Sequence, residues 1–229
     1  MKRISSHLMR MWETDIALTA LLIFLLIYIF FLFPMAQIGS VRFLTTLFFY
    51  LILISGAIAA TKNRILRTLV VSWGILAFVL VWVRHLFPYQ ALLFATICLS
   101  LIFLVLLALL ILAQAFREGP TTSHRIMGAV AVYLLLGLIW SQAYCLIALF
   151  APEAFSIQGS LAPGDMESLQ PHLFYFSFIT LTTLGYGDIV AVHPMARMLV
   201  ILEAVTGQLF PAILLARLVS LHVQTKHKT

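Results

Sequence analysis

Charged residues are scarce in this chain: of its 229 residues, only 10% are Asp, Glu, Lys or Arg. Hydrophobic residues account for 63%, whereas soluble domains contain about 45–50%. A fold with so few charges could not cover its surface with groups that water solvates well. The composition therefore excludes a water-soluble globular protein and predicts a membrane protein.

Cysteines and catalytic motifs are also scarce. The two cysteines, Cys98 and Cys145, both lie in long apolar segments, which argues against a disulfide framework and favours a packing role. Within the apolar segments there is no Gly-x-Ser-x-Gly sequence, no His and Glu pair at metal-binding spacing and no Asp pair. These absences argue against an intramembrane enzyme. We expect no enzymatic activity, no organic cofactor and no nucleic-acid partner.

Long apolar runs dominate what is present. Six of them have about the length that a helix needs to cross a bilayer, which is roughly 20 residues. They cover residues 16–33, 41–60, 66–87, 91–116, 126–150 and 195–223. A seventh, residues 171–182, is too short to cross, and we interpret it as re-entrant, because such backbone must be buried in protein or line a watery cavity. The sequence predicts an all-α membrane protein.

Basic residues are distributed unevenly between the loops. If the N-terminus is cytoplasmic, three of the 14 Lys and Arg residues, namely Arg42, Arg84 and Arg197, fall on the outer side and the other 11 on the inner side. Basic loops face the cytoplasm. We therefore predict a multi-pass protein of the inner cell membrane with both termini cytoplasmic, in which the segment 171–182 enters from outside.

Between the last two spans, residues 182–188 read TTLGYGD. Two glycines two residues apart allow positive φ angles that bulky residues resist, so that successive carbonyl groups can point the same way. Residues 175–181, just before this run, are apolar and rich in hydroxyls, which fits a short helix. Pro171 suits the first turn of that helix. The C-terminus of the helix falls near Thr182, and its negative dipole end would favour a cation.

This run and its setting resemble the selectivity filter of the tetrameric potassium channels, and the whole chain resembles bacterial channels with six membrane helices and one pore segment. The implied filter residues are Thr183, Leu184, Gly185, Tyr186 and Gly187, with K⁺ bound at the first four. Thr182 and Asp188 would support the filter and its outer mouth. One filter in each chain implies a homotetramer in the lipid bilayer that conducts K⁺ passively.

Two other functions involve ion movement. A potassium-uptake transporter built from pore-like repeats would need four filter-like runs in one chain, and this chain has one. A non-selective monovalent cation channel is the closer alternative, because the neighbourhood of the filter departs from the family pattern. Phe176 stands where many relatives have a Trp that donates to the filter Asp, and Ile179 offers no carboxylate. We therefore expect Asp188 to be less restrained than in those relatives.

The last span contains a glycine and a proline one helical turn apart. Gly207 follows Gly187 by 20 residues, the position of the gating-hinge glycine in the family. Pro211 has no N–H to donate to the carbonyl of Gly207. Both a hinge and a static kink would explain this pair.

The resemblance also assigns directions to side chains of the last span. It places Gln208, Pro211 and Leu215 toward the ion cavity. Because five residues rotate a helix by about 140°, Glu203 then faces backward. We expect it to hydrogen-bond to the hydroxyls of the short helix, Ser177 or Thr180.

The chain divides into four parts. Residues 1–116 form a four-helix membrane region, 117–125 a charged cytoplasmic linker with a helix-breaking Gly-Pro pair, 126–223 the pore domain and 224–229 a short cytoplasmic tail. The pore domain comprises outer helix, turret, pore helix, filter and inner helix. The fourth span carries no charge between Ala91 and Ala115, whereas a voltage sensor needs several Arg or Lys in one membrane helix. We expect residues 1–116 not to act as a sensor.

For the channel implied by this resemblance, we predict a shallow dependence of open probability on voltage. One charge that crosses the membrane field contributes about 2.3 kcal/mol per 100 mV, and the fourth span offers no charge to move. Recordings of the purified protein in planar bilayers at a series of voltages measure this dependence. Steep activation that carries several gating charges per channel would contradict the prediction.

Overall fold

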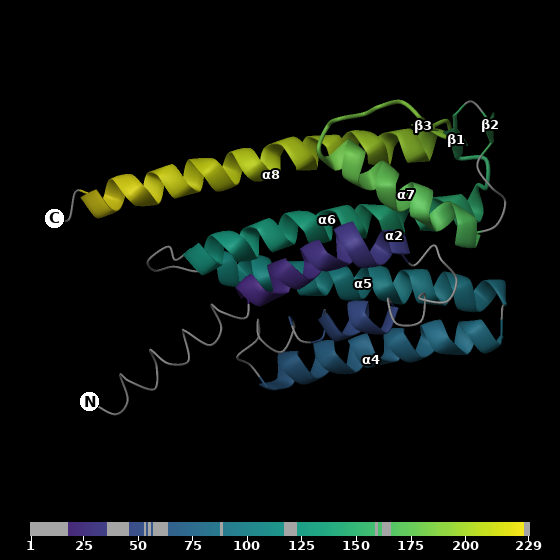
Figure 1. Ribbon diagram of the computed structural model, residues 1–229, viewed down its shortest axis with the longest axis horizontal. Coiled ribbons are helices and arrows are strands. Elements are labelled where there is room, and N and C mark those ends of the chain that lie inside the picture. Colours follow the sequence, from purple (N-terminus) through teal and green to yellow (C-terminus); the bar gives the residue numbers. More distant parts are fainter. Residues whose placement is uncertain are drawn as a thin grey trace. The chain divides into compact units, whose positions relative to one another are not determined.

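The computed structural model describes residues 18–35, 46–52, 54, 56, 64–87, 89–116, 123–158, 160–161 and 166–226 (Figure 1). The protein is mostly helical, as the sequence predicts. Among these described residues, four helices are long and apolar enough to cross a membrane: Arg67–Arg84, Gln90–Ala115, Arg125–Phe150 and Pro194–Arg217. They correspond to the last four of the six predicted spans.

The structure does not show the first two predicted spans as full-length membrane helices. The first contains a shorter apolar helix, Leu18–Leu32, whose second part is the π-helix η1 (Tyr28–Leu32), followed by α2 (Phe33–Met35). The second span, 41–60, falls largely outside the described residues, although residues 46–52 are helical. Six crossings of the membrane therefore stay a prediction.

The chain forms two compact units. The first comprises Met1–Leu92 with Ile102–Leu134, and the second Leu93–Leu101 with Leu135–Thr229. The boundary passes through two long helices, α5 (Gln90–Ala115) and α6 (Ser123–Phe150).

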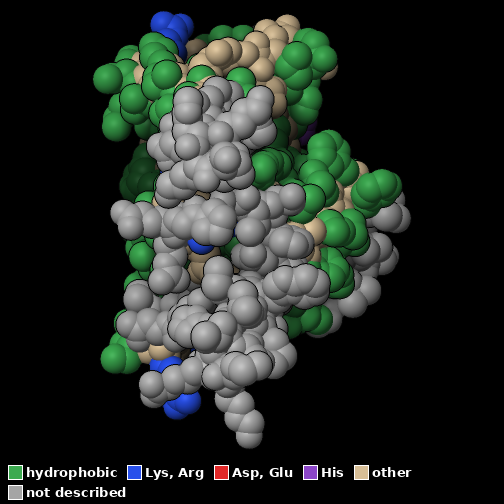
Figure 2. Space-filling model, turned by 90° about the vertical axis from the view of Figure 1, so that its left-hand side faces the viewer, with side chains coloured by type: hydrophobic (Ala, Val, Ile, Leu, Met, Phe, Trp, Pro, Cys, Tyr) green, Lys and Arg blue, Asp and Glu red, His purple; other side chains and the backbone are tan. Residues whose placement is uncertain are grey.

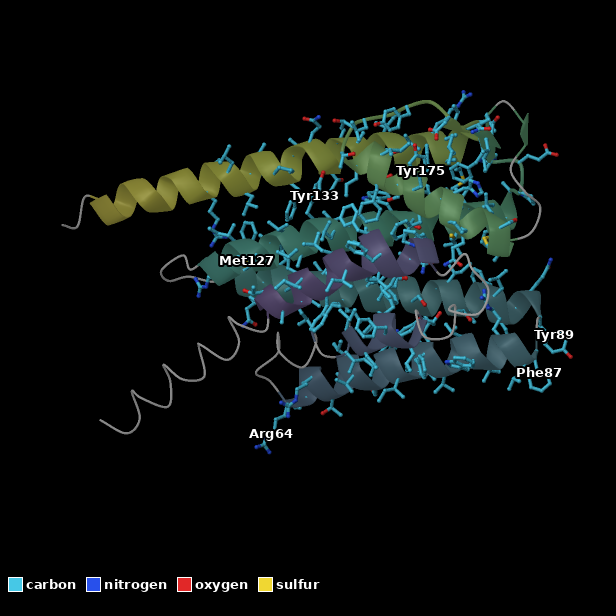
Figure 3. The ribbon with its side chains drawn as sticks, viewed as in Figure 1. Arg64, Phe87, Tyr89, Met127, Tyr133 and Tyr175 are labelled. Carbon is cyan, nitrogen blue, oxygen red and sulfur yellow. The ribbon has the colours of Figure 1, made fainter. Side chains whose placement is uncertain are left out.

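The first unit is held together by apolar and aromatic contacts. Among the described helices that lie entirely in this unit, the longest is α4 (Arg64–Leu86). Tyr50 stacks on Phe103 with 6.5 Å between ring centroids, and a Cβ added to Gly74 of α4 would lie 2.9 Å from the Phe103 ring. Figure 3 shows Arg64 at one end of α4 and Tyr89 beyond the other end. A basic residue at one end and an exposed aromatic at the other are typical of a membrane helix.

The surface agrees with this interpretation. Described side chains on the face in Figure 2 are mostly hydrophobic, and the basic side chains appear only as a few small separate groups. Large apolar residues such as Phe30, Phe31 and Ile65 are 65%, 68% and 70% exposed. Such exposure suits lipid as the surrounding solvent.

The second unit contains the end of α6, a small sheet and two further helices. Its elements are β1 (Phe155–Ile157), β2 (Ser160–Leu161), α7 (Met166–Leu181), β3 (Ile189–Ala191) and α8 (Pro194–Lys226). The antiparallel strands have the order β2-β1-β3. This sheet departs from the all-α fold that the sequence predicts, because strands of two or three residues are too short to show a period of two.

The core of this unit is aromatic. The rings of Tyr144, Phe155 and Phe176 meet with centroids 5.2–5.6 Å apart, and all three are buried. They come from α6, β1 and α7, so the cluster joins the sheet to two helices.

Helix α7 starts earlier than the sequence predicts. It begins at Met166, so that Pro171 lies inside the helix and not in its first turn. Proline there removes one helical hydrogen bond, to the carbonyl of Glu167. The longer helix packs along α8 (Figure 1).

Candidate functional site

The loop of residues 182–188 connects α7 to β3, and the sign of the backbone φ angle alternates from residue to residue between Thr183 and Gly187. Thr183, Gly185 and Gly187 have φ angles of +60°, +50° and +77°, whereas Leu184 and Tyr186 between them do not have positive φ. The two glycines thus take the conformation that the sequence predicts. A β-branched residue at positive φ is strained by about 1–3 kcal/mol, which marks Thr183 as a residue whose position matters.

The amide groups at the start of this loop turn back onto α7. Thr183 N donates to Thr180 O at 2.9 Å, and the amides of Leu184 and Gly185 both donate to Ile179 O, at 2.9 and 3.2 Å. These bonds satisfy carbonyls that a helix end leaves unpaired. Within the described part of the chain, the carbonyls of residues 183–187 accept no backbone hydrogen bond. Their oxygens are therefore available to bind something else.

The loop is also exposed along its length. All residues from 182 to 187 are exposed, although Leu181 before them is fully buried and Ile189 after Asp188 is 4% exposed. Leu184 and Tyr186 expose 59% and 70% of their side chains. Apolar side chains next to unpaired carbonyls are unusual on the surface of a fully assembled protein. A second chain would cover them.

The outer end of the loop is held by two groups. Gln158 N donates to Asp188 O at 2.7 Å, which ties the loop to the β1–β2 turn. The Tyr175 hydroxyl of α7 interacts with the Asp188 carboxyl, one oxygen of which, Oδ1, is buried without a hydrogen-bond partner among the described residues. Figure 3 labels Tyr175 on α7.

This interaction bears on an expectation from the sequence. The sequence predicts an Asp188 that is less restrained than in relatives, because Phe176 cannot donate. Tyr175 interacts with the carboxyl but Asp188 Oδ1 has no partner in the described chain, so the expectation stays a prediction. Phe176 instead belongs to the buried ring cluster. One residue rotates a helix by about 100°, so the side chain that faces the loop and the one that faces the core are neighbours in sequence.

Behind the loop, a buried carboxyl group joins three helices. Glu203 of α8 is 0% exposed. Its Oε1 lies 2.6 Å from Ser177 Oγ of α7, and its Oε2 accepts a hydrogen bond from the Tyr144 hydroxyl of α6. The sequence predicts that Glu203 faces the hydroxyls of α7 but does not predict the bond from Tyr144, although a buried tyrosine hydroxyl usually needs a partner.

The number of protons available for hydrogen bonds in this cluster indicates the protonation state of Glu203. Ser177 Oγ also lies 2.7 Å from the carbonyl oxygen of Gly137, yet a serine hydroxyl has a single proton to donate. If Ser177 donates to Gly137, Glu203 must supply the proton between Oε1 and Oγ. A protonated Glu203 completes every bond in the cluster, whereas an ionised one would leave two acceptors facing each other in a buried site. We therefore interpret Glu203 as the neutral acid.

Gly207 of α8 lies against the end of α7. A Cβ at this position would come within 2.0 Å of the Leu181 carbonyl oxygen, so only glycine permits this approach. Helix α8 continues through both Gly207 and Pro211. The hinge stays a prediction, and the close contact is a second reason for a glycine here.

The polar and cavity residues predicted on α8 are also exposed. Gln208, Pro211 and Leu215 are all exposed, and Gln208 Nε2 lies 3.0 Å from Thr183 Oγ1. Gln208 is thus brought to the loop. Pro211 and Leu215 lie one and two turns further along the helix, and their role in a cavity stays a prediction.

The comparison with known proteins agrees with the position of this site. Residues 130–224, which include α7, the loop and most of α8, match the family model described as "Ion channel". This match supports an ion-channel family of the potassium-channel type for this part of the chain.

Two curated relatives are similar to a part of the chain. Protein LctB of Bacillus caldotenax is 30% identical over 87 residues, which cover 38% of this chain and 64% of that protein. Protein LctB of Geobacillus stearothermophilus is 31% identical over 86 residues, or 38% and 62%. The chain thus spans less than two thirds of the length of these relatives. No solved structure matches the chain.

The neutral form of Glu203 leads to a prediction about stability. Glu203→Gln keeps one acceptor for Tyr144 and one donor for Ser177, so we expect a change of less than about 1 kcal/mol. Glu203→Leu leaves the Tyr144 hydroxyl without a partner and the Ser177 oxygen without its donor, and it should destabilise by about 2–5 kcal/mol per chain, since an unsatisfied buried group costs about 1–3 kcal/mol. Thermal unfolding in detergent measures both.

Glu153→Gln, which removes an acid from an exposed site, serves as the matched control and should change nothing. If Glu203→Gln were as destabilising as Glu203→Leu, the carboxyl would be ionised in the folded protein and the neutral assignment would be wrong.

Because Gly207 contacts Leu181, we expect different effects from substitutions at Gly207 and Pro211, whereas a hinge alone predicts the same effect from both. Pro211→Ala restores the N–H that can donate to the Gly207 carbonyl, and under the hinge hypothesis it changes open probability alone. Gly207→Ala pushes on the Leu181 carbonyl, and we expect it to impair ion selectivity or assembly. Single-channel recording distinguishes these effects. Unaltered selectivity and assembly in Gly207→Ala would show that the close contact does not support the loop.

Proposed function

We propose that the protein is a potassium-selective channel that conducts K⁺ passively through a pore formed by four copies of the chain. The observation that carries this proposal is the alternating backbone of residues 183–187, with positive φ at Thr183, Gly185 and Gly187. The alternation lets successive carbonyl oxygens face one side, where they can replace the water around an ion. The carbonyls that would do so accept no backbone hydrogen bond in the described chain.

A tetramer is supported by what one chain leaves uncovered. One loop supplies oxygens on a single side of an ion, so several loops must surround it. The exposed apolar residues Leu184 and Tyr186 lie within that loop. The apolar side chains of α8 that are more than half exposed include Met195, Met198, Ile201, Leu202, Leu209, Ile213 and Leu215. A neighbouring chain or lipid would cover these side chains.

The proposed location is the inner cell membrane, with both termini cytoplasmic, since most basic residues then lie inside. In this arrangement the pore is formed by residues 126–223, and K⁺ binds at Thr183, Leu184, Gly185 and Tyr186.

A non-selective monovalent cation channel is the alternative. The features that favour it are the departures from the family pattern around the filter, at Phe176 and Ile179. The interaction of Tyr175 with the Asp188 carboxyl offers a restraint of another kind, and we expect the filter to be selective. Leu184 still departs from the commonest residue of the family, but its side chain is not expected to contact ions.

Reversal potentials of the purified protein in planar bilayers, with K⁺ and Na⁺ on opposite sides, test the proposal. We expect a strong preference for K⁺ and block by Ba²⁺, which has nearly the radius of K⁺ and twice its charge. Equal permeability of K⁺ and Na⁺ would favour the non-selective alternative, and absence of any current from assembled protein would argue against both.

A matched pair of substitutions connects the selectivity to the loop. Gly185→Ala adds a Cβ at φ +50°, which costs about 1–2 kcal/mol per chain, and we expect it to abolish K⁺ selectivity. Gly128→Ala lies in α6 and meets only the flexible Leu18 side chain at 3.2 Å, so it should leave selectivity unchanged.

A further inference from the structure

The Thr183 hydroxyl has two hydrogen-bonding partners, although it belongs to the proposed ion site. It donates its proton to the Thr182 carbonyl oxygen at 2.7 Å. Its oxygen lies 3.0 Å from Gln208 Nε2. A hydroxyl has one proton and two lone pairs, so one lone pair remains after these two bonds.

The direction of the second bond follows from the first. Because the Thr183 proton is used by Thr182, the atom of Gln208 that contacts Oγ1 must itself be a donor. The side-chain nitrogen of glutamine is a donor and its oxygen is not. The network thus fixes the orientation of the Gln208 amide, which the heavy-atom positions alone would leave open.

We propose that Gln208 is a positioning residue for the ion-binding site nearest to α7: it fixes the rotamer of Thr183 and shares the hydroxyl oxygen with the bound cation. This inference rests on the proposed function, because it takes the loop to be an ion filter. It goes further by assigning a direct contact between the inner helix and an ion ligand. The residue acts through Thr183 and needs no contact with the ion.

The site is built at two adjoining positions of α8. Gly207 contacts the Leu181 carbonyl at the end of α7, and Gln208 bonds to Thr183 two residues further along. The first contact sets how close α8 lies to the base of the loop, and the second orients a side chain of the loop. A shift of α8 at this level therefore alters the ion site itself.

Removal of the donor should strengthen cation binding at this site. Gln208→Met has a similar size but no N–H, so the Thr183 oxygen recovers a lone pair. We expect the half-blocking concentration of Ba²⁺, added from the side of the α8 C-terminus, to fall about fivefold, the effect of one ordinary hydrogen bond on an equilibrium. Thr206→Val, two residues away with its hydroxyl bonded to Leu202 O within α8, is the control and should leave the block unchanged.

Two further backgrounds show whether the effect passes through Thr183. Thr183→Ser keeps the hydroxyl, and Gln208→Met should produce the same fall there. Thr183→Cys replaces it by a thiol that accepts weakly, and Gln208→Met should then have no further effect. An equal fall in all three backgrounds, or no fall in the Thr183 background, would overturn the proposal, because Gln208 would then act on the cavity in general or not at all.

A second measurement covers the case in which Thr183→Cys fails to assemble. The side-chain amide signal of Gln208, identified by its loss in Gln208→Met, should shift in NMR spectra when K⁺ is exchanged for an impermeant cation. A signal that does not respond would overturn the shared-oxygen arrangement. Wild-type reversal potentials report separately on the proposed function. A channel without K⁺ preference that still showed the background-dependent Ba²⁺ shift would retain this inference and overturn the other.

Discussion

The backbone amides of residues 183–185 bond to the last carbonyls of α7, and the arrangement of the site depends on this contact. With the amides turned inward, the carbonyls of the loop are left to face the other side. The positive φ of Thr183 shows that the loop accepts strain to keep this orientation. Because the loop is built directly on the end of α7, everything that positions α7 also positions the loop.

Three helices share that task through one buried acid. Glu203 reaches Ser177 on α7 and Tyr144 on α6, and Gly137 approaches the Phe178 ring so closely that a Cβ would lie 2.7 Å from it. A neutral carboxyl can both donate and accept, so it can join two hydroxyls without a buried charge. The cluster orients α7 from behind, while Gly207 sets its distance from α8.

The sequence was sufficient for features that depend on local pattern and insufficient for those that depend on contacts between distant segments. Helix lengths, the two glycines at positive φ and the backward direction of Glu203 follow from hydropathy, residue type and helical geometry. The contact of Asp188 with Tyr175 does not follow in this way, because it depends on which face of α7 each of the neighbouring residues Tyr175 and Phe176 occupies. Tyr144 and Gly137 lie 59 and 40 residues from the groups they bind, and nothing in their local sequence marks them. The sheet was missed because its strands are short.

The pairing of β1 with β3 has a consequence for the length of the loop. Phe155 pairs with Ala191 and Ile157 with Ile189, and β3 alternates buried, exposed, buried. Since α7 fixes where the loop begins and this register fixes where it ends, an inserted or deleted residue would turn Ile189 and Ala191 out of the core and Val190 into it. The register of the small sheet therefore constrains the number of residues between α7 and β3, whereas it does not constrain which side chains those residues carry.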